Sequence, residues 1–136
     1  DEVAAVAALH PAIEIVSTVD RPNVGIVIDT FHFHASGSRM EDLARVPVEK
    51  LFVIHLNGCE DRPRGELTDA HRLFPGEGAI PIEAILRALG ARGFDGTMSI
   101  EIFRPEYWQR PPLDVAREAR AKAVGVLMNA GYTIDG

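Results

Sequence analysis

Disulfides, membrane spans and an excess of basic charge are all missing from this sequence. Its 136 residues include one cysteine, Cys59, so no disulfide can form within the chain, as expected in a reducing compartment such as the cytoplasm. No apolar run approaches the roughly 18–20 residues that cross a membrane, and no secretory signal is visible. Lys and Arg number 14 against 20 Asp and Glu, and the formal charge of -6 opposes nucleic-acid binding. The first residue is not Met, which suggests a cut or processed start.

Three short apolar runs are present, and each ends in an acid or a histidine: Asp29, His55 and Glu101. Runs this short and rich in β-branched residues are typical of parallel strands that are buried on both faces. Chemistry gathers at the carboxyl ends of parallel strands. We therefore expect these three residues to hold one divalent metal ion, either Mn²⁺, Co²⁺, Zn²⁺, Fe²⁺ or Mg²⁺. The alternative is that they are ordinary polar residues where strands meet loops.

The spacing of apolar residues predicts repeated βα units. Strands are expected at 24–29, 51–56 and 97–102, and helices over 1–19, 39–45, 81–92 and 113–130. This order indicates an α/β domain with a parallel sheet over residues 1–136. Three parallel strands leave two unpaired edges, so we expect the chain to be part of a larger α/β barrel.

Two segments between these elements carry further candidate residues. Alternation of aromatic and histidine residues predicts an extended segment over 30–34, which would let His32 reach the cavity beside Asp29. Residues 57–79 form a long polar connection, and loops of this length are usually functional or disordered. Within it, Arg72 either binds a substrate oxygen with its planar donors or only pairs with a nearby acid, Glu77 or Asp69. Cys59 lacks an activating partner and is interpreted as an incidental thiol.

Four stretches of the chain then carry a resemblance to a known family. They read NVGIVIDTFHFH at 23–34, VIHL at 53–56, DAHRLFPGEG at 69–78 and SIEIFRPEYW at 99–108. Together they resemble the C-terminal part of sugar isomerase/epimerase (xylose isomerase-like) TIM barrels, most closely the inosose isomerase branch. The resemblance implies the C-terminal portion of a (β/α)8 barrel, with three parallel strands and covering helices.

The resemblance also implies a function and a ligand set. The family isomerises or epimerises a keto-polyol or sugar, here best matched by an inosose, through proton transfer and an enediolate. Its metal is held by a Glu, an Asp, a His and a second Glu, of which the last three correspond to Asp29, His55 and Glu101. The first Glu would lie before residue 1, together with five strands of the barrel. By the same resemblance Glu101 is also a catalytic acid/base, His32 is a second catalytic residue, and His32 and Arg72 hold substrate hydroxyl groups.

Two alternatives remain open at this point. An endonuclease IV-like nuclease shares this barrel, and Asp69 and His71 would then be a second metal-ligand pair, although the acidic charge argues against DNA. An inactive fragment that persists by self-association is the other, because its strand edges are unpaired. We accordingly expect a small polyol or sugar substrate, and either self-association or a missing N-terminal barrel half as the partner.

Overall fold

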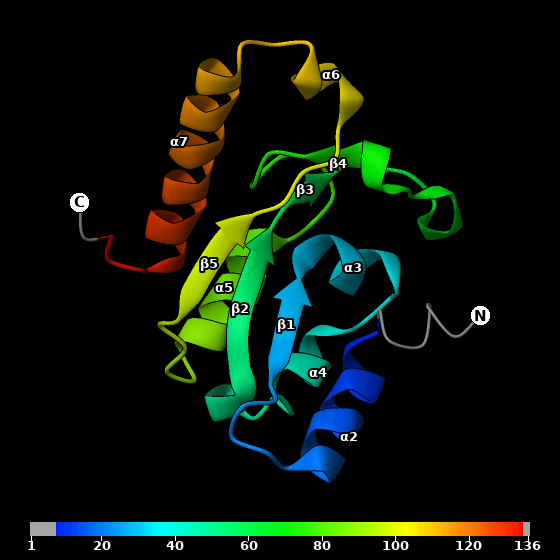
Figure 1. The fold of residues 1–136 in the computed structure, drawn as a ribbon, viewed down its shortest axis with the longest axis vertical. Helices are drawn as coiled ribbons and strands as arrows, with labels where there is room; N and C mark the ends of the chain where they lie inside the picture. Colours follow the sequence, from blue (N-terminus) through cyan, green and yellow to red (C-terminus); the bar gives the residue numbers. More distant parts are fainter. Residues whose placement is uncertain (1–7, 135–136) are drawn as a thin grey trace.

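A three-stranded parallel sheet is the centre of the computed structural model, which describes residues 8–134 (Figure 1). The strands β1 (Ile26–Asp29), β2 (Leu51–Leu56) and β5 (Thr97–Ile100) lie in the order β1-β2-β5. The register pairs Asp29 with His55 and His55 with Ser99. The predicted α/β class and the three parallel strands are confirmed. Both β1 and β5 are shorter than predicted, so Glu101 lies one residue beyond the end of β5.

Four helices match predicted positions with slightly different bounds, and two short helices, at 30–35 and 105–108, were not predicted. They are α2 (Leu9–Val19), α3 (Thr30–Ala35), α4 (Met40–Leu43), α5 (Ile82–Gly90), α6 (Pro105–Trp108) and α7 (Pro112–Ala130), with short 3-10 turns η1 (Val48–Lys50), η2 (Arg64–Glu66) and η3 (Asp69–His71). The start of the predicted helix over 1–19 lies outside the described residues. Among residues 8–134, no helix combines the length and apolarity needed to cross a membrane.

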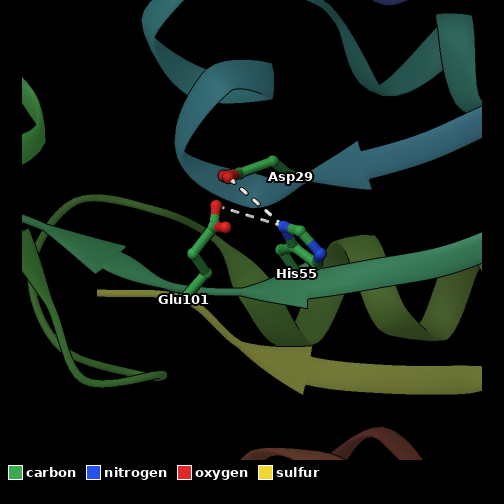
Figure 2. A group of neighbouring side chains, drawn as sticks. All are labelled: Asp29, His55 and Glu101. Carbon is green, nitrogen blue, oxygen red and sulfur yellow. Dashed lines mark hydrogen bonds and ion pairs between the residues drawn. The ribbon is translucent and has the colours of Figure 1, made fainter. Parts of the chain in front are cut away.

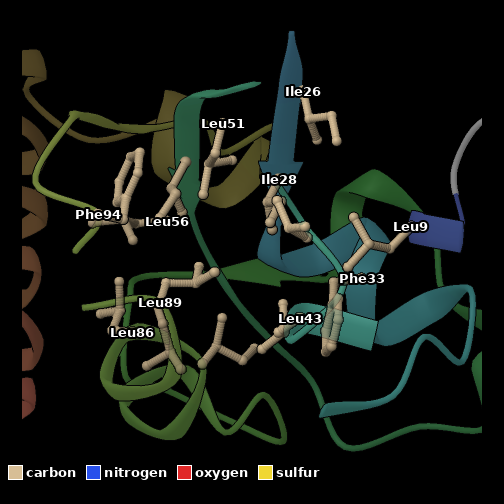
Figure 3. Packing of buried hydrophobic residues seen from close by; sticks show 14 of the residues in the cluster. Leu9, Ile26, Ile28, Phe33, Leu43, Leu51, Leu56, Leu86, Leu89 and Phe94 are labelled. Atoms are coloured by element: carbon tan, nitrogen blue, oxygen red, sulfur yellow. The ribbon is translucent and has the colours of Figure 1, made fainter. Parts of the chain in front are cut away.

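Helices cover one face of the sheet and form the core. Helix α5 lies behind the strands in Figure 1 and buries Ile85, Leu86 and Leu89 completely, at the i, i+1 and i+4 positions of one helical stripe. They pack with Ile54 of β2 and Leu43 of α4 in a single apolar cluster (Figure 3). The helices and this face of the sheet therefore hold the carboxyl ends of the strands in a fixed arrangement.

The opposite face of the sheet has little cover among residues 8–134. Val27 lies in the middle of β1, yet its side chain is 53% exposed. Its partners across the sheet are Val53 and Thr97, which are half-buried and exposed respectively. In the described part of the chain, β1 and β5 each also have one unpaired edge. An exposed apolar face is typical of the interior of a barrel, and unpaired edges are typical of strands that pair with further strands.

The segment after β1 is a helix, and the prediction of an extended segment at 30–34 is wrong. Asp29 has extended dihedrals and caps α3, because its carboxylate accepts hydrogen bonds from the backbone N–H groups of Phe31 and His32. Phe31 and Phe33 are both buried and His32 is exposed, so the aromatic–histidine alternation reflects burial in a short helix and not a pleat. An N-cap at the strand end outweighs the local pattern.

The long connection over 57–79 is ordered and folds onto the carboxyl end of the sheet. Its strands β3 (Gly58–Cys59) and β4 (Arg72–Leu73) pair antiparallel. Gly78 has φ +74°, and a Cβ there would collide with the carbonyl oxygen of Cys59, so glycine is required for this close approach. The connection therefore places Arg72 beside the strand ends.

Candidate metal centre

Three predicted ligands meet at the carboxyl ends of the three strands (Figure 2). One ligand atom from each of Asp29, His55 and Glu101 lies within 4.8 Å of the others. The Nδ1 atom of His55 lies 3.2 Å from Oε2 of Glu101 and 3.8 Å from Oδ2 of Asp29. Ligands at about 2.1 Å from one ion stand roughly 3.0–3.4 Å apart, so small adjustments bring this set to a common metal.

Asp29 is the most constrained of the three. Its Oδ1 atom accepts hydrogen bonds from the N–H groups of Phe31 and His32 and from Nδ2 of Asn57, at 2.8–3.3 Å. Its Oδ2 atom accepts one from Nη1 of Arg72 at 2.8 Å. Because Oδ1 has three donors and Oδ2 has one, Oδ2 is the oxygen with a lone pair left, and it is the one that faces His55.

Asn57 is a site residue that the sequence analysis missed. Its side chain is fully buried, and its backbone N–H donates to Oγ1 of Thr30 at 2.8 Å while that hydroxyl donates to the carbonyl of Asn57. These two hydrogen bonds connect the residue after β2 to the first residue of α3. Its position two residues after His55, directly beyond the end of β2, was the available signal.

The amide of Asn57 also has an acceptor that no described residue uses. Since a carboxylate only accepts, Nδ2 must be the atom that donates to Asp29, and this settles the orientation of the amide. The buried Oδ1 atom then has no hydrogen-bond partner within residues 8–134. The same amide thus donates to the candidate ligand Asp29 and keeps an acceptor free for a water molecule or a hydroxylated ligand.

Arg72 is buried at the centre of this network, with a side chain only 1% exposed. Its Nε donates to Oδ1 of Asp69 at 2.8 Å and Nη1 donates to Asp29. Nη1 also donates to the carbonyl of Glu101 at 3.2 Å. The guanidinium lies over the ring of Phe31, and the Phe103 ring is also close, with its centroid 5.5 Å away. The pairing with Asp69 that was one interpretation of Arg72 is present, and Asp29 is an additional partner.

His32 lines the cavity at the metal centre. This cavity has a volume of about 480 Å³ and is bounded by the three ligands, by His32 and by apolar residues of α2, α3 and β1 that include Leu9, Val27 and Phe33. The Nε2 atom of His32 lies 3.2 Å from Nη2 of Arg72. A cavity of this size, with polar groups at one end and apolar walls, is suited to a small molecule.

Other candidates lie apart from this centre. The Nδ1 atom of His71 accepts from the backbone N–H of Thr68, and Asp69 pairs with Arg72. Within the described residues, Asp29, His55 and Glu101 form the only group of three or more metal-ligating side chains close enough to share a metal ion, and neither Asp69 nor His71 belongs to it. Burial raises the pKa of the Cys59 thiol, which agrees with its interpretation as an unreactive side chain.

An ion-pair network holds the segment after β5 against the connection. Glu60 accepts from Arg62 at 2.6 Å and from Arg104 at 2.8 Å. These two guanidinium groups lower the pKa of Glu60 from 4.5 to about 2. The network ties the segment that contains Glu101 and Phe103 to the loop that contains Arg72.

Known proteins are similar to this chain in sequence and in structure. Residues 5–123 match the family model described as xylose isomerase-like TIM barrel. Inosose isomerases from Bacillus subtilis and Halalkalibacterium halodurans are 46% and 43% identical over 116 residues, which is 85% of this chain and 42% and 41% of those proteins. A crystal structure of the IolI protein with a bound zinc atom superposes with a TM-score of 0.90 at 42% identity, over 94% of this chain and 46% of that one.

The chain thus spans less than half the length of the relatives it matches. The range that matches the family model, residues 5–123, contains the three strands, the connection and Asp29, His55 and Glu101. The chain belongs to the xylose isomerase-like TIM barrel family.

Proposed function

We propose that this chain is the carboxyl-terminal part of a metal-dependent isomerase or epimerase that acts on a keto-polyol or sugar, with an inosose as the best candidate. The observation that carries the proposal is the convergence of Asp29, His55 and Glu101 at the carboxyl ends of three neighbouring parallel strands. Two kinds of relatives support it, namely the inosose isomerases and the zinc-bound IolI structure. The identity of the metal and of the polyol is part of the proposal.

In the isomerisation, a proton leaves the hydroxyl-bearing carbon beside the carbonyl and returns to the former carbonyl carbon through an enediolate, while the hydroxyl proton passes to the former carbonyl oxygen. A divalent metal held by Asp29, His55 and Glu101 would supply Lewis-acid polarisation of the substrate carbonyl. The carboxylate of Glu101 is 40% exposed, in contrast to Asp29 at 9%, so it is the one positioned to exchange a proton with a substrate. We therefore assign Glu101 the role of acid/base and Asp29 a purely ligating role.

The residues around the ligands orient the substrate. His32 lines the cavity and is expected to bind a substrate hydroxyl. Arg72 has four of its five N–H groups engaged by Asp69, Asp29, the Glu101 carbonyl and His32. One donor on Nη2 remains for a substrate oxygen, which limits a direct contact to a single hydrogen bond.

The test is turnover of an inosose by a protein with a complete barrel that includes this sequence. We expect Glu101→Gln to abolish turnover while the fold stays intact, because glutamine keeps the size but cannot take a proton. Glu106→Gln is the matched control: Glu106 lies five residues on, its side chain is 67% exposed and it contacts Arg104 rather than the metal centre. Near-normal turnover in Glu101→Gln would remove this residue from the mechanism.

Metal binding is tested separately by anomalous scattering from crystals grown with Mn²⁺ or Zn²⁺. We expect one peak within roughly 2.0–2.3 Å of a ligand atom from each of Asp29, His55 and Glu101. A peak elsewhere, with these three side chains pointing apart, would contradict the proposed metal centre even if turnover were observed.

We further propose that the open face of the sheet is covered by additional barrel strands, from another part of the protein or from a second copy. The exposed Val27 in the middle of β1 and the two unpaired strand edges support this. Residues 1–136 alone are expected to associate in sedimentation experiments and, by the resemblance to a four-ligand family, to bind metal weakly. A compact, monodisperse monomer that binds metal tightly would contradict this proposal.

A further inference from the structure

The hydrogen bond between Arg72 and His32 determines which nitrogen of the imidazole carries a proton. An arginine side chain has donors only, so Nε2 of His32 must be the acceptor of the 3.2 Å contact with Nη2. A neutral imidazole with a bare Nε2 carries its proton on Nδ1. The rest of the network keeps this bond in place, since Arg72 is buried and lies over the ring of Phe31.

Asp69 anchors the Nε end of the guanidinium group. It accepts from Nε at 2.8 Å, while Asp29 accepts from Nη1 on the opposite side of the same planar group. With Nε and Nη1 both anchored, Nη2 has one direction left, and that direction is toward His32. The side chain of Asp69 is 57% exposed, and its ion pair is with Arg72, at 2.8 Å. It therefore acts on the site through the arginine.

We propose that Asp69 and Arg72 are a positioning pair that holds His32 with Nε2 unprotonated and Nδ1 protonated. The consequence of this inference rests on the proposed function. With Nε2 engaged, the ring of His32 has only Nδ1–H left for a substrate, to which it donates a hydrogen bond. Proton abstraction is then left to carboxylates such as Glu101. Nε2 cannot accept a substrate proton while Arg72 occupies its only lone pair. A single fixed tautomer means that the hydrogen-bond donor on this wall of the cavity is in place before a substrate binds.

The experiment is nitrogen NMR of the histidine side chains in metal-free protein labelled with ¹⁵N-histidine, at about pH 8, above the usual histidine pKa of ~6.5. His32→Gln identifies the signals of His32 by their disappearance. In the unsubstituted protein we expect a pyridine-like shift at Nε2 and a pyrrole-like shift at Nδ1. Asp69→Ala is expected to give a mixture of both tautomers, and Arg72→Met to give the same or a larger change. Glu66→Gln, an exposed acid of the same connection, is the control and should leave the signals unchanged.

The outcomes separate this inference from the proposed function. A pyrrole-like Nε2 in the unsubstituted protein, or an unchanged tautomer in a folded Asp69→Ala protein, would overturn the inference. Folding of each variant is checked by circular dichroism. If Arg72→Met unfolds, the spectra of Asp69→Ala and of the unsubstituted protein are sufficient to test the inference. Because the spectra need neither metal nor substrate, a fixed tautomer in a protein that turns over no inosose would refute the isomerase proposal alone.

Discussion

Two carboxylates bind the same arginine at the same distance, and they differ strongly in their exposure to water. Asp29 and Asp69 each accept a hydrogen bond from Arg72 at 2.8 Å. The Asp29 side chain is 9% exposed and that of Asp69 is 57% exposed. At 2.8 Å the Coulomb energy is about 1.5 kcal/mol in water and about 6 kcal/mol at an effective dielectric constant of 20. Removing one charge should therefore cost far more at Asp29 than at Asp69.

The expected losses follow from what each substitution leaves behind. Asp69→Asn removes a screened pair, and we expect it to lower the free energy of unfolding by less than about 1 kcal/mol. Asp29→Asn leaves a buried cation and places an NH₂ donor against other donors, because Arg72 faces one oxygen of Asp29 and two backbone N–H groups face the other. We expect a loss of about 3 kcal/mol, at the lower end for a broken buried pair since Asp69 still contacts the guanidinium.

The assay is urea unfolding followed by circular dichroism, with a chelator present so that metal binding does not contribute. Equal dependence of the unfolding free energy on urea in all three proteins is required for the comparison. Losses for the two variants that agree within about 0.5 kcal/mol would refute the reasoning, because they would show that burial does not decide the strength of these pairs.

Three further predictions concern the core, the ion-pair network and the connection. Leu86→Ala removes a side chain with 0% exposure, and urea unfolding should show a loss of about 2–5 kcal/mol; a loss below about 1 kcal/mol would contradict the close packing of α5. Arg62 and Arg104 lower the pKa of Glu60 from 4.5 to about 2, so their pairing with it stabilises the fold above pH 4.5 and is lost as the pH falls through about 2. Glu60→Gln should therefore make stability less dependent on pH within that window in acid titrations, and an unchanged dependence would contradict the network. Gly78→Ala, at φ +74° and against a carbonyl oxygen of β3, should cost at least about 2 kcal/mol in thermal unfolding, and an unchanged melting temperature would contradict the close approach.

The sequence alone determined the strands, the main helices and the meeting of the three candidate metal ligands. Short β-branched runs are local signals, and the rule that parallel strands end at one edge converts them into a spatial prediction for Asp29, His55 and Glu101. The i, i+3, i+4 spacing in α5 identified its buried side in the same way. The local pattern failed after β1, where the N-cap of Asp29 outweighed an alternation that is typical of strands.

Only the tertiary structure decided which groups surround those ligands. Arg72 is 43 residues from Asp29, and no periodicity predicts that a 23-residue connection folds back to bury its guanidinium between them and Phe31. The amide of Asn57 and its unpaired Oδ1 atom depend likewise on the distance between β2 and α3. Polar groups that become buried need hydrogen-bond partners, and these partners are often distant in the sequence. Which partners are within reach depends on the folded chain and cannot be read from the local sequence.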